Sequence, residues 1–332
     1  MKKFDLNFGG KKMFTSSFHS SIFNALKARS AHLLSLGATL LILSGCMKEP
    51  FTGPEKLGGT WVSAKQLNQG WETYNNYCMQ CHGMDGGGNG PAAQGMVPQP
   101  RNFKQGLYKF GTVTMGELPT DEDLKRIIRH GLNGTPMLPW DISDERLMAV
   151  IQYIKTFSPE WKKNSSGTSV VFQPDPWGPE LASEAILQGK KVYHGLAQCY
   201  TCHPSYATLD EVSAASKELT DTETEELREN PHLSLNQGSS YGHSYMPPDL
   251  TRHHIRSART REDIYKRLVV GVNGTTMPAW RGMLSLTGDK EEDEKNLWAL
   301  AYYVESLQKL KWNWKARQEF FKSLNQNRSM AR

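Results

Sequence analysis

Four of the five cysteines in this 332-residue chain belong to one five-residue pattern that occurs twice. Residues 78–82 read CMQCH and residues 199–203 read CYTCH. The pattern C-x-x-C-H is typical of covalent haem attachment, in which both thiols form thioether bonds and the adjacent histidine ligates the iron. A zinc site would need a second ligand pair nearby, and a thioredoxin-type redox pair leaves the histidine unexplained. The sequence therefore predicts two haem c groups, held by Cys78, Cys81, Cys199 and Cys202, with His82 and His203 on the irons.

The ligand on the other face of each iron decides the chemistry, because a closed site carries electrons and an open one admits substrate. Met137 lies in NGTPMLPW and Met277 lies in NGTTMPAW. Each methionine follows a glycine that ends an expected helix, and each precedes a tryptophan, Trp140 or Trp280, that we expect to pack against the haem or the core. A thioether ligand raises the reduction potential. We predict Met137 and Met277 as distal iron ligands, with loop filling as the alternative role.

Other methionines and histidines compete for these roles. Met96 and Met246 each precede a proline-rich run, PQPRNF or PPDLTR. A proline carbonyl in such a run commonly orients the proximal imidazole, so we expect both methionines on the histidine side of the haem. Four histidines have no counterpart in the other copy, and we expect them at the surface rather than on iron: His130, His194, His253 and His254.

The chain repeats itself around these motifs. Residues 120–140 align without a gap on residues 260–280, and each segment begins with Thr-x-x-Asp, which indicates a helix start with a capping box. Apolar residues at helical spacing follow. Each helix is expected to end at a glycine in the left-handed conformation, Gly131 or Gly271.

The flanking helices repeat as well. Residues 147–154 match residues 297–304, at an offset that is ten residues larger because of an acidic insertion around 283–294. Ahead of each haem motif a glycine precedes a tyrosine by four positions, as Gly70 and Tyr74 and again as Gly189 and Tyr193. The sequence therefore predicts one helical module written twice.

Three segments fall outside the repeat. Residues 158–180 contain four prolines and no helical period, which indicates a linker. Residues 204–246 enlarge the second copy and include an acidic, helix-like stretch at 210–229, for which we favour a solvated surface over a docking element. The basic, aromatic tail from Leu310 is expected to be a helix packed on its own module, with docking on the first module or on a partner as the alternative.

Charge and hydrophobicity exclude two classes of protein. The chain has 39 Lys and Arg and 34 Asp and Glu. Residues 1–45 contain six of the basic residues and one of the acidic ones, so residues 46–332 contain 33 basic and 33 acidic residues. A balanced mature chain gives no charge-based case for nucleic-acid binding. A hydrophobic content of 38% indicates a soluble body rather than a multi-span membrane protein.

The first 46 residues have the features of a processing signal. Residues 33–45 form an apolar run, LLSLGATLLILSG, that is too short to span a bilayer but suits a secretory signal. The run ends in Leu43-Ser44-Gly45-Cys46, which resembles the bacterial lipoprotein processing box. The resemblance implies cleavage before Cys46, acylation of its thiol and attachment to the periplasmic side of a bacterial membrane, with Met47 favouring the outer membrane. An uncleaved anchor is the alternative.

The succession of CxxCH, a proline-rich loop, G-x-N-G-T-x-M-x-x-W and a final helix resembles class I cytochrome c domains. The methionine loop is similar to that of the dihaem subunit of cbb3-type oxidases, although that subunit has a transmembrane helix where this chain has a lipoprotein signal. The resemblance implies an all-α fold of two tandem class I cytochrome c domains, each with a few helices around one covalently bound haem. It also implies the axial pairs His82 with Met137 and His203 with Met277.

These features predict a membrane-anchored protein that relays single electrons between donor and acceptor proteins, with a respiratory complex as a candidate partner. We expect no catalytic residues, no nucleic-acid partner and no activity as an enzyme. The alternative is an enzyme similar to the dihaem cytochrome c peroxidases, which need one open haem; the near-duplicate methionine loops argue against that asymmetry.

The expected organisation follows from these boundaries. Residues 1–45 are the signal peptide, 46–59 a tether, 60–160 the first module, 161–181 a linker, 182–310 the second module with the insertion 204–246, and 311–332 the basic tail.

Overall fold

The computed structural model of the chain describes residues 49–330, so the predicted signal segment 1–45 and the lipidation site Cys46 lie outside the described part. The fold described below is that of the unit that begins at Phe51. Its regular structure is helical, which confirms the predicted all-α class. One short antiparallel pair is the exception, formed by β1 (Glu55–Leu57) and β2 (Thr60–Val62). Among the described residues, no helix is long and apolar enough to cross a membrane.

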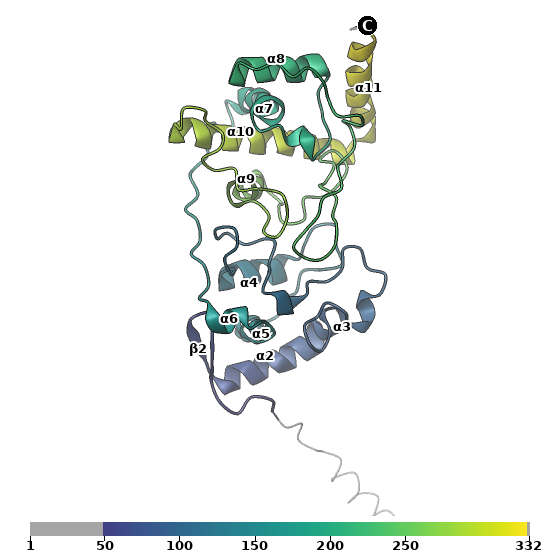
Figure 1. Cartoon of the computed structure of the whole chain (residues 1–332). Helices are drawn as coiled ribbons and strands as arrows, with labels where there is room; N and C mark the ends of the chain where they lie inside the picture. Colours follow the sequence, from purple (N-terminus) through teal and green to yellow (C-terminus); the bar gives the residue numbers. More distant parts are fainter. Residues whose placement is uncertain (1–48, 331–332) are drawn as a thin grey trace, which may run out of the picture. The chain divides into compact units, whose positions relative to one another are not determined.

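Helices follow one another along the chain with long loops between them (Figure 1). The part of the chain up to residue 163 contains α2 (Ala64–Tyr77), α3 (Met79–His82), α4 (Asp121–His130), α5 (Asp144–Lys155) and α6 (Glu160–Lys163). The later part contains α7 (Ala182–Lys191), α8 (Leu209–Thr220), α9 (Arg261–Val270), α10 (Lys290–Lys309) and α11 (Trp314–Met330).

The same helix crossing occurs in both modules. A Cβ atom on Gly70 of α2 would lie 2.2 Å from the carbonyl oxygen of Ala149 in α5. A Cβ atom on Gly189 of α7 would lie 2.0 Å from the carbonyl oxygen of Ala299 in α10. Only a residue without a side chain permits such close backbone contact. The recurrence of Gly70 and Gly189 in the sequence is therefore the recurrence of one helix crossing.

Each crossing is surrounded by its own hydrophobic core. Leu147 of α5 and Leu297 of α10 occupy matching positions, and both are fully buried. The first core groups Leu147 with side chains of α2, α4 and α5, including Leu67, Tyr74, Leu124, Ile128, Val150 and Ile151, whereas Leu297 belongs to the second core. The second core draws on α8, α9 and α10, including Val212, Ile264, Leu268, Leu300 and Val304. The division of the chain into two domains with the predicted boundaries remains a prediction.

The helices that precede the methionine loops begin as predicted. The Thr120 hydroxyl accepts from the Asp123 amide at 3.2 Å and the Thr260 hydroxyl accepts from the Asp263 amide at 3.2 Å. Each carboxylate accepts in turn from the threonine amide, at 3.2 Å in α4 and 3.1 Å in α9. Both predicted capping boxes are thus present.

The ends of these two helices differ from the expectation in one angle. Gly131 and Gly271 have the positive φ that was predicted, 65° and 69°. Their ψ angles are −169° and −162°, which is extended rather than left-handed helical. This region of backbone space belongs almost only to glycine. The cause is the methionine loop, since a Cβ atom on Gly131 would lie 2.5 Å from the Met137 carbonyl oxygen.

The segments outside the repeat are more tightly packed than the sequence suggests. The predicted linker contains α6, whose Trp161 is fully buried in the first core. Farther along it, the Val170 amide donates to the Thr112 carbonyl oxygen at 2.8 Å and the Gln173 amide donates to the Tyr265 hydroxyl at 3.0 Å. The linker therefore lies against both modules.

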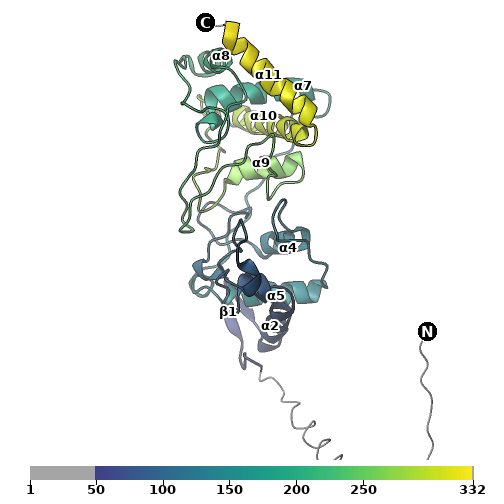
Figure 2. The ribbon, with the colours of Figure 1, turned by 90° about the vertical axis from the view of Figure 1, so that its right-hand side faces the viewer.

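The acidic stretch 210–229 differs in part from the prediction, whereas the C-terminal tail agrees with it. The acidic stretch 210–229 is helical only in its first part, because α8 ends at Thr220 and Asp221 adopts the left-handed conformation with φ 56°. The tail forms α11, which continues the chain beyond the end of α10 (Figure 2). Its Phe320 and Phe321 pack against the second core, so the tail lies on its own module as predicted.

Candidate haem sites

The first C-x-x-C-H motif forms one helical turn. Cys78 caps the end of α2, and its carbonyl oxygen accepts from the His82 amide at 2.9 Å. Residues three and four apart on a helix share a face, so this turn presents Cys78, Cys81 and His82 together. The Tyr74 hydroxyl donates to the carbonyl oxygen of Gly83 at 2.7 Å and fixes the end of the turn.

The second motif is built in the same way. The Cys199 carbonyl oxygen accepts from the His203 amide at 2.9 Å. The Tyr193 hydroxyl donates to the Pro204 carbonyl oxygen at 3.0 Å, the position that corresponds to Gly83. The two tyrosines that precede the motifs in the sequence therefore do the same work in both modules: each holds the backbone next to the histidine.

Both motif histidines are oriented by a backbone carbonyl. The Nδ1 atom of His82 lies 3.1 Å from the Arg101 carbonyl oxygen, and that of His203 lies 3.0 Å from the Pro248 carbonyl oxygen. A carbonyl can only accept, so Nδ1 carries the proton in each ring and Nε2 keeps a lone pair for a metal. The acceptor expected in the proline-rich run is a proline in the second module, whereas in the first it is the following arginine.

Burial keeps these groups in uncharged forms. It lowers the pKa of both imidazoles, and the carbonyl hydrogen bonds only partly oppose this effect. Neutral imidazole is the form that ligates iron. Burial also raises the pKa of the Cys78 and Cys199 thiols to about 12, which does not suit a reactive thiolate.

The methionine loops have the same hydrogen bonds in both modules. The Met137 amide donates to the Thr135 hydroxyl and the Met277 amide donates to the Thr275 hydroxyl, both at 3.2 Å. The methionine carbonyl oxygens accept from Leu132 at 2.9 Å and from Val272 at 3.1 Å. This network holds each methionine at one place in its loop. Met137 packs against the first core and Met277 against the second.

A large cavity lies between the motif and the methionine loop of the second module. Its volume is about 740 Å³, within the range of cofactor sites, and it is lined by Cys199, Cys202, His203 and Met277. Trp280 also lines it, and the indole Nε1 of Trp280 is buried without a hydrogen-bond partner in the described structure. These groups fit a haem, which needs two thiols for its thioether bonds and two axial ligands for its iron. His203 and Met277 would hold its iron, and the two cysteines would hold its edge.

The corresponding residues of the first module surround the first core. Cys78, Met137 and Trp140 all pack against it, and Trp140 lies edge-on to Tyr77 with 5.4 Å between ring centroids. The His82 ring stacks on Phe103 at 4.5 Å. Cys78, Met137 and Trp140 are thus gathered around the first core, as Cys199, Met277 and Trp280 are around the second.

The prediction for one of the competing histidines was wrong. His194 was expected at the surface, but it is 1% exposed. Its Nδ1 lies 2.9 Å from the Lys190 carbonyl oxygen and its Nε2 accepts from the Tyr206 amide at 3.2 Å. Burial lowers the pKa of His194 to about 4. This ring is a neutral hydrogen-bonding bridge in the core, and both its nitrogens are already in use.

The other competing residues lie at or near the surface. His130 and His253 are exposed, whereas His254 is half-buried and lies with Nδ1 2.7 Å from Lys311 Nζ. Met246 is 61% exposed and lines the cavity beside Pro248, on the side of the proximal carbonyl.

Comparison with known proteins shows likeness to one family model and to solved structures. The family model described as "Cytochrome C oxidase, cbb3-type, subunit III" matches residues 65–154. A chain in the solved structure of the reducing HAO-like protein complex of Kuenenia stuttgartiensis is 33% identical, with a TM-score of 0.55. That match covers 72% of the present chain and 95% of the other. No curated protein matches the chain.

Proposed function

Because the chain is a c-type cytochrome of the family that includes a chain of the reducing HAO-like protein complex, we propose that it relays single electrons through two haems. Its donor and acceptor are other proteins. Haem iron supplies the one-electron couple, and the chain supplies axial ligands, burial and surfaces for its partners. Turnover of a small substrate is not part of this role.

The duplication of the whole site carries the proposal. Each module has a motif helix turn, a tyrosine that holds it, a carbonyl that orients the imidazole and a methionine fixed by a threonine. An enzyme would need one iron with an open position, so its two sites would have to differ at the methionine loop. The two loops share the same internal hydrogen bonds. We therefore assign His82 with Met137 and His203 with Met277 as the axial pairs of two closed haems.

The partner is proposed from the relative. That protein belongs to a redox complex, so we propose that the present chain also docks on a larger redox partner and exchanges electrons with it. The lipoprotein signal leads us to place the chain on the periplasmic side of a bacterial membrane, held by an acylated Cys46. A respiratory complex at that membrane is the class of partner that this placement favours.

Separate experiments test the electron relay, the redox partner and the membrane attachment. Coulometric reduction of the purified holoprotein is expected to take up two electrons per chain, and a pyridine haemochrome assay is expected to give two haems. Uptake of one electron, or one haem per chain, would contradict the relay. Purification from detergent-solubilised membranes should recover a redox partner with the native chain. Replacing residues 1–46 by a secretory signal that is cleaved without lipidation should release the chain from the membrane without changing its haem content.

A further inference from the structure

Three basic residues meet where the two modules touch, and none of them forms an ion pair with an acidic residue in the described part of the chain. Arg101 and Lys109 belong to the first module and Arg256 to the second. The Arg101 guanidinium lies 4.0 Å from the centroid of the Tyr241 ring, and Lys109 Nζ lies 4.8 Å from the same centroid. No ion pair to Arg101, Lys109 or Arg256 is formed within residues 49–330.

This cluster is unfavourable as it stands. Burial, together with the nearby charges of Arg101 and Arg256, lowers the pKa of Lys109 to about 8. Burial also lowers the pKa of Arg101 and of Arg256. Like charges taken partly out of water are costly unless an anion compensates them. The cluster therefore calls for an anion that does not come from the described part of the chain.

Two of the three residues line the cavity of the second module. Lys109 and Arg256 lie in its wall together with His203 and Met277. The wall also contains Arg252 and Arg267, and none of the described residues that line it is an aspartate or a glutamate. The missing anion therefore belongs inside this cavity. A haem brings two propionate carboxylates, which match the unpaired lysine and arginine in number and in charge.

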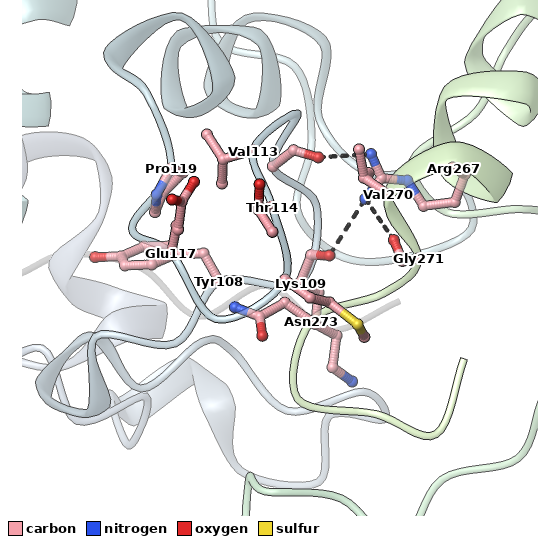
Figure 3. A pocket seen from close by; sticks show the side chains of 12 residues that line it. Tyr108, Lys109, Val113, Thr114, Glu117, Pro119, Arg267, Val270, Gly271 and Asn273 are labelled. Carbon is pink, nitrogen blue, oxygen red and sulfur yellow. Dashed lines mark hydrogen bonds between the residues drawn. The ribbon is translucent and has the colours of Figure 1, made fainter. Parts of the chain in front are cut away.

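The contact between the modules holds both residues in place. The buried Arg267 of α9 donates to the carbonyl oxygens of Lys109 at 3.4 Å and Gly111 at 2.8 Å, as well as to its own module at Gly271 (Figure 3). In the other direction, the Asn133 amide of the first methionine loop donates to the Arg256 carbonyl oxygen at 2.9 Å. The backbones of Lys109 and Arg256 are thus each fixed by a hydrogen bond from the other module.

We propose that Lys109 and Arg256 bind the propionate carboxylates of the haem in the second module, so that the first module completes the cofactor site of the second. The inference rests on the proposed second haem. It gives the contact between the modules a role in tuning one haem. A positive charge near the iron favours the reduced form, which carries one positive charge less, so Lys109 and Arg256 raise the potential of that haem.

The test compares variants of Lys109 and Arg256 in the full-length holoprotein. In Lys109→Met and Arg256→Met, the propionate bending band in the resonance Raman spectrum should shift, because carboxylate hydrogen bonds are lost. The ratio of reduced to oxidised second haem at a fixed potential should fall about tenfold, equivalent to about 59 mV for one electron. A Met137→His background lowers the potential of the first haem and so resolves the second.

Two matched variants keep the inference refutable. Lys109→Arg keeps the charge and should retain both signals. Lys104→Met removes a first-module lysine that pairs with Asp85 and does not line the cavity, and it should change neither. An unshifted Raman band in both Lys109→Met and Arg256→Met, or an equal shift in Lys104→Met, would overturn the propionate assignment. Absence of the second haem from the unmodified protein would overturn the proposed function instead.

Discussion

Replacement of Gly271 by alanine should open the second haem to external ligands. Gly271 has φ 69° and ψ −162°, where a residue with a Cβ atom is strained by about 1–3 kcal/mol. The new Cβ atom would also lie 2.6 Å from the Pro278 carbonyl carbon and 2.7 Å from the Met277 carbonyl oxygen. Both contacts are with backbone, so the loop must move and carry Met277 with it. We expect Gly271→Ala to lose at least about 1–3 kcal/mol of unfolding free energy.

The same variant should change the spectrum. If Met277 closes the iron, displacement of its loop leaves that position open, and carbon monoxide should bind to one reduced haem per chain. The matched control is Gly282→Ala, since Gly282 also has a positive φ of 82° but a Cβ atom there meets no atom within 4 Å. The control should lose stability without binding carbon monoxide. If Gly271→Ala binds no more carbon monoxide than Gly282→Ala, the assignment of Met277 as an axial ligand is wrong.

Three further predictions concern the scaffold of the second module. Gly189→Ala would place a Cβ atom 2.0 Å from the Ala299 carbonyl oxygen, and this overpacking should cost about 1–3 kcal/mol or more in urea unfolding. Burial lowers the pKa of His194 from its ordinary 6.5 to about 4 in the folded state. Because the unfolded chain then binds a proton more readily than the folded one, the free energy of unfolding should fall by about 3 kcal/mol between pH 6.5 and pH 4. His194→Gln should lessen that fall in denaturation curves at the two pH values, and an identical fall would contradict the prediction. The Asp293 carboxylate accepts from the Gly282 and Leu284 amides at 2.8 and 2.7 Å. Asp293→Ala should therefore lower the free energy of unfolding by about 1–3 kcal/mol for each amide left unpaired, and a loss below about 0.5 kcal/mol would refute this.

Features that depend on neighbours in the sequence could be predicted well. The capping boxes at Thr120 and Thr260 involve residues three positions apart, and the positive φ of Gly131 and Gly271 follows from their place at a helix end. The extended ψ of these glycines could not be predicted. It depends on where the returning methionine loop lies, and no local pattern records that.

Features that depend on distant contacts were missed or misjudged. His194 looks like an isolated polar residue, but its ring bridges the Lys190 carbonyl and the Tyr206 amide inside the core. The sequence showed that Tyr74 recurs in both modules. It did not predict the hydrogen bond that the Tyr74 hydroxyl donates to the Gly83 carbonyl oxygen. Nothing in the sequence around Lys109 indicated a role in the cavity. Its place in the cavity of the other module arises only because α9 docks Arg267 on the loop that contains it.

The account depends most directly on two irons that are both closed by protein ligands. The measurement that tests it is a carbon monoxide difference spectrum of the reduced holoprotein, with haem counted in the same sample by the pyridine assay. The account predicts two haems per chain and no spectral change on adding carbon monoxide. A change equal to one haem would contradict it, because either Met137 or Met277 would then not be an axial ligand and the chain would have an open site of the kind an enzyme needs.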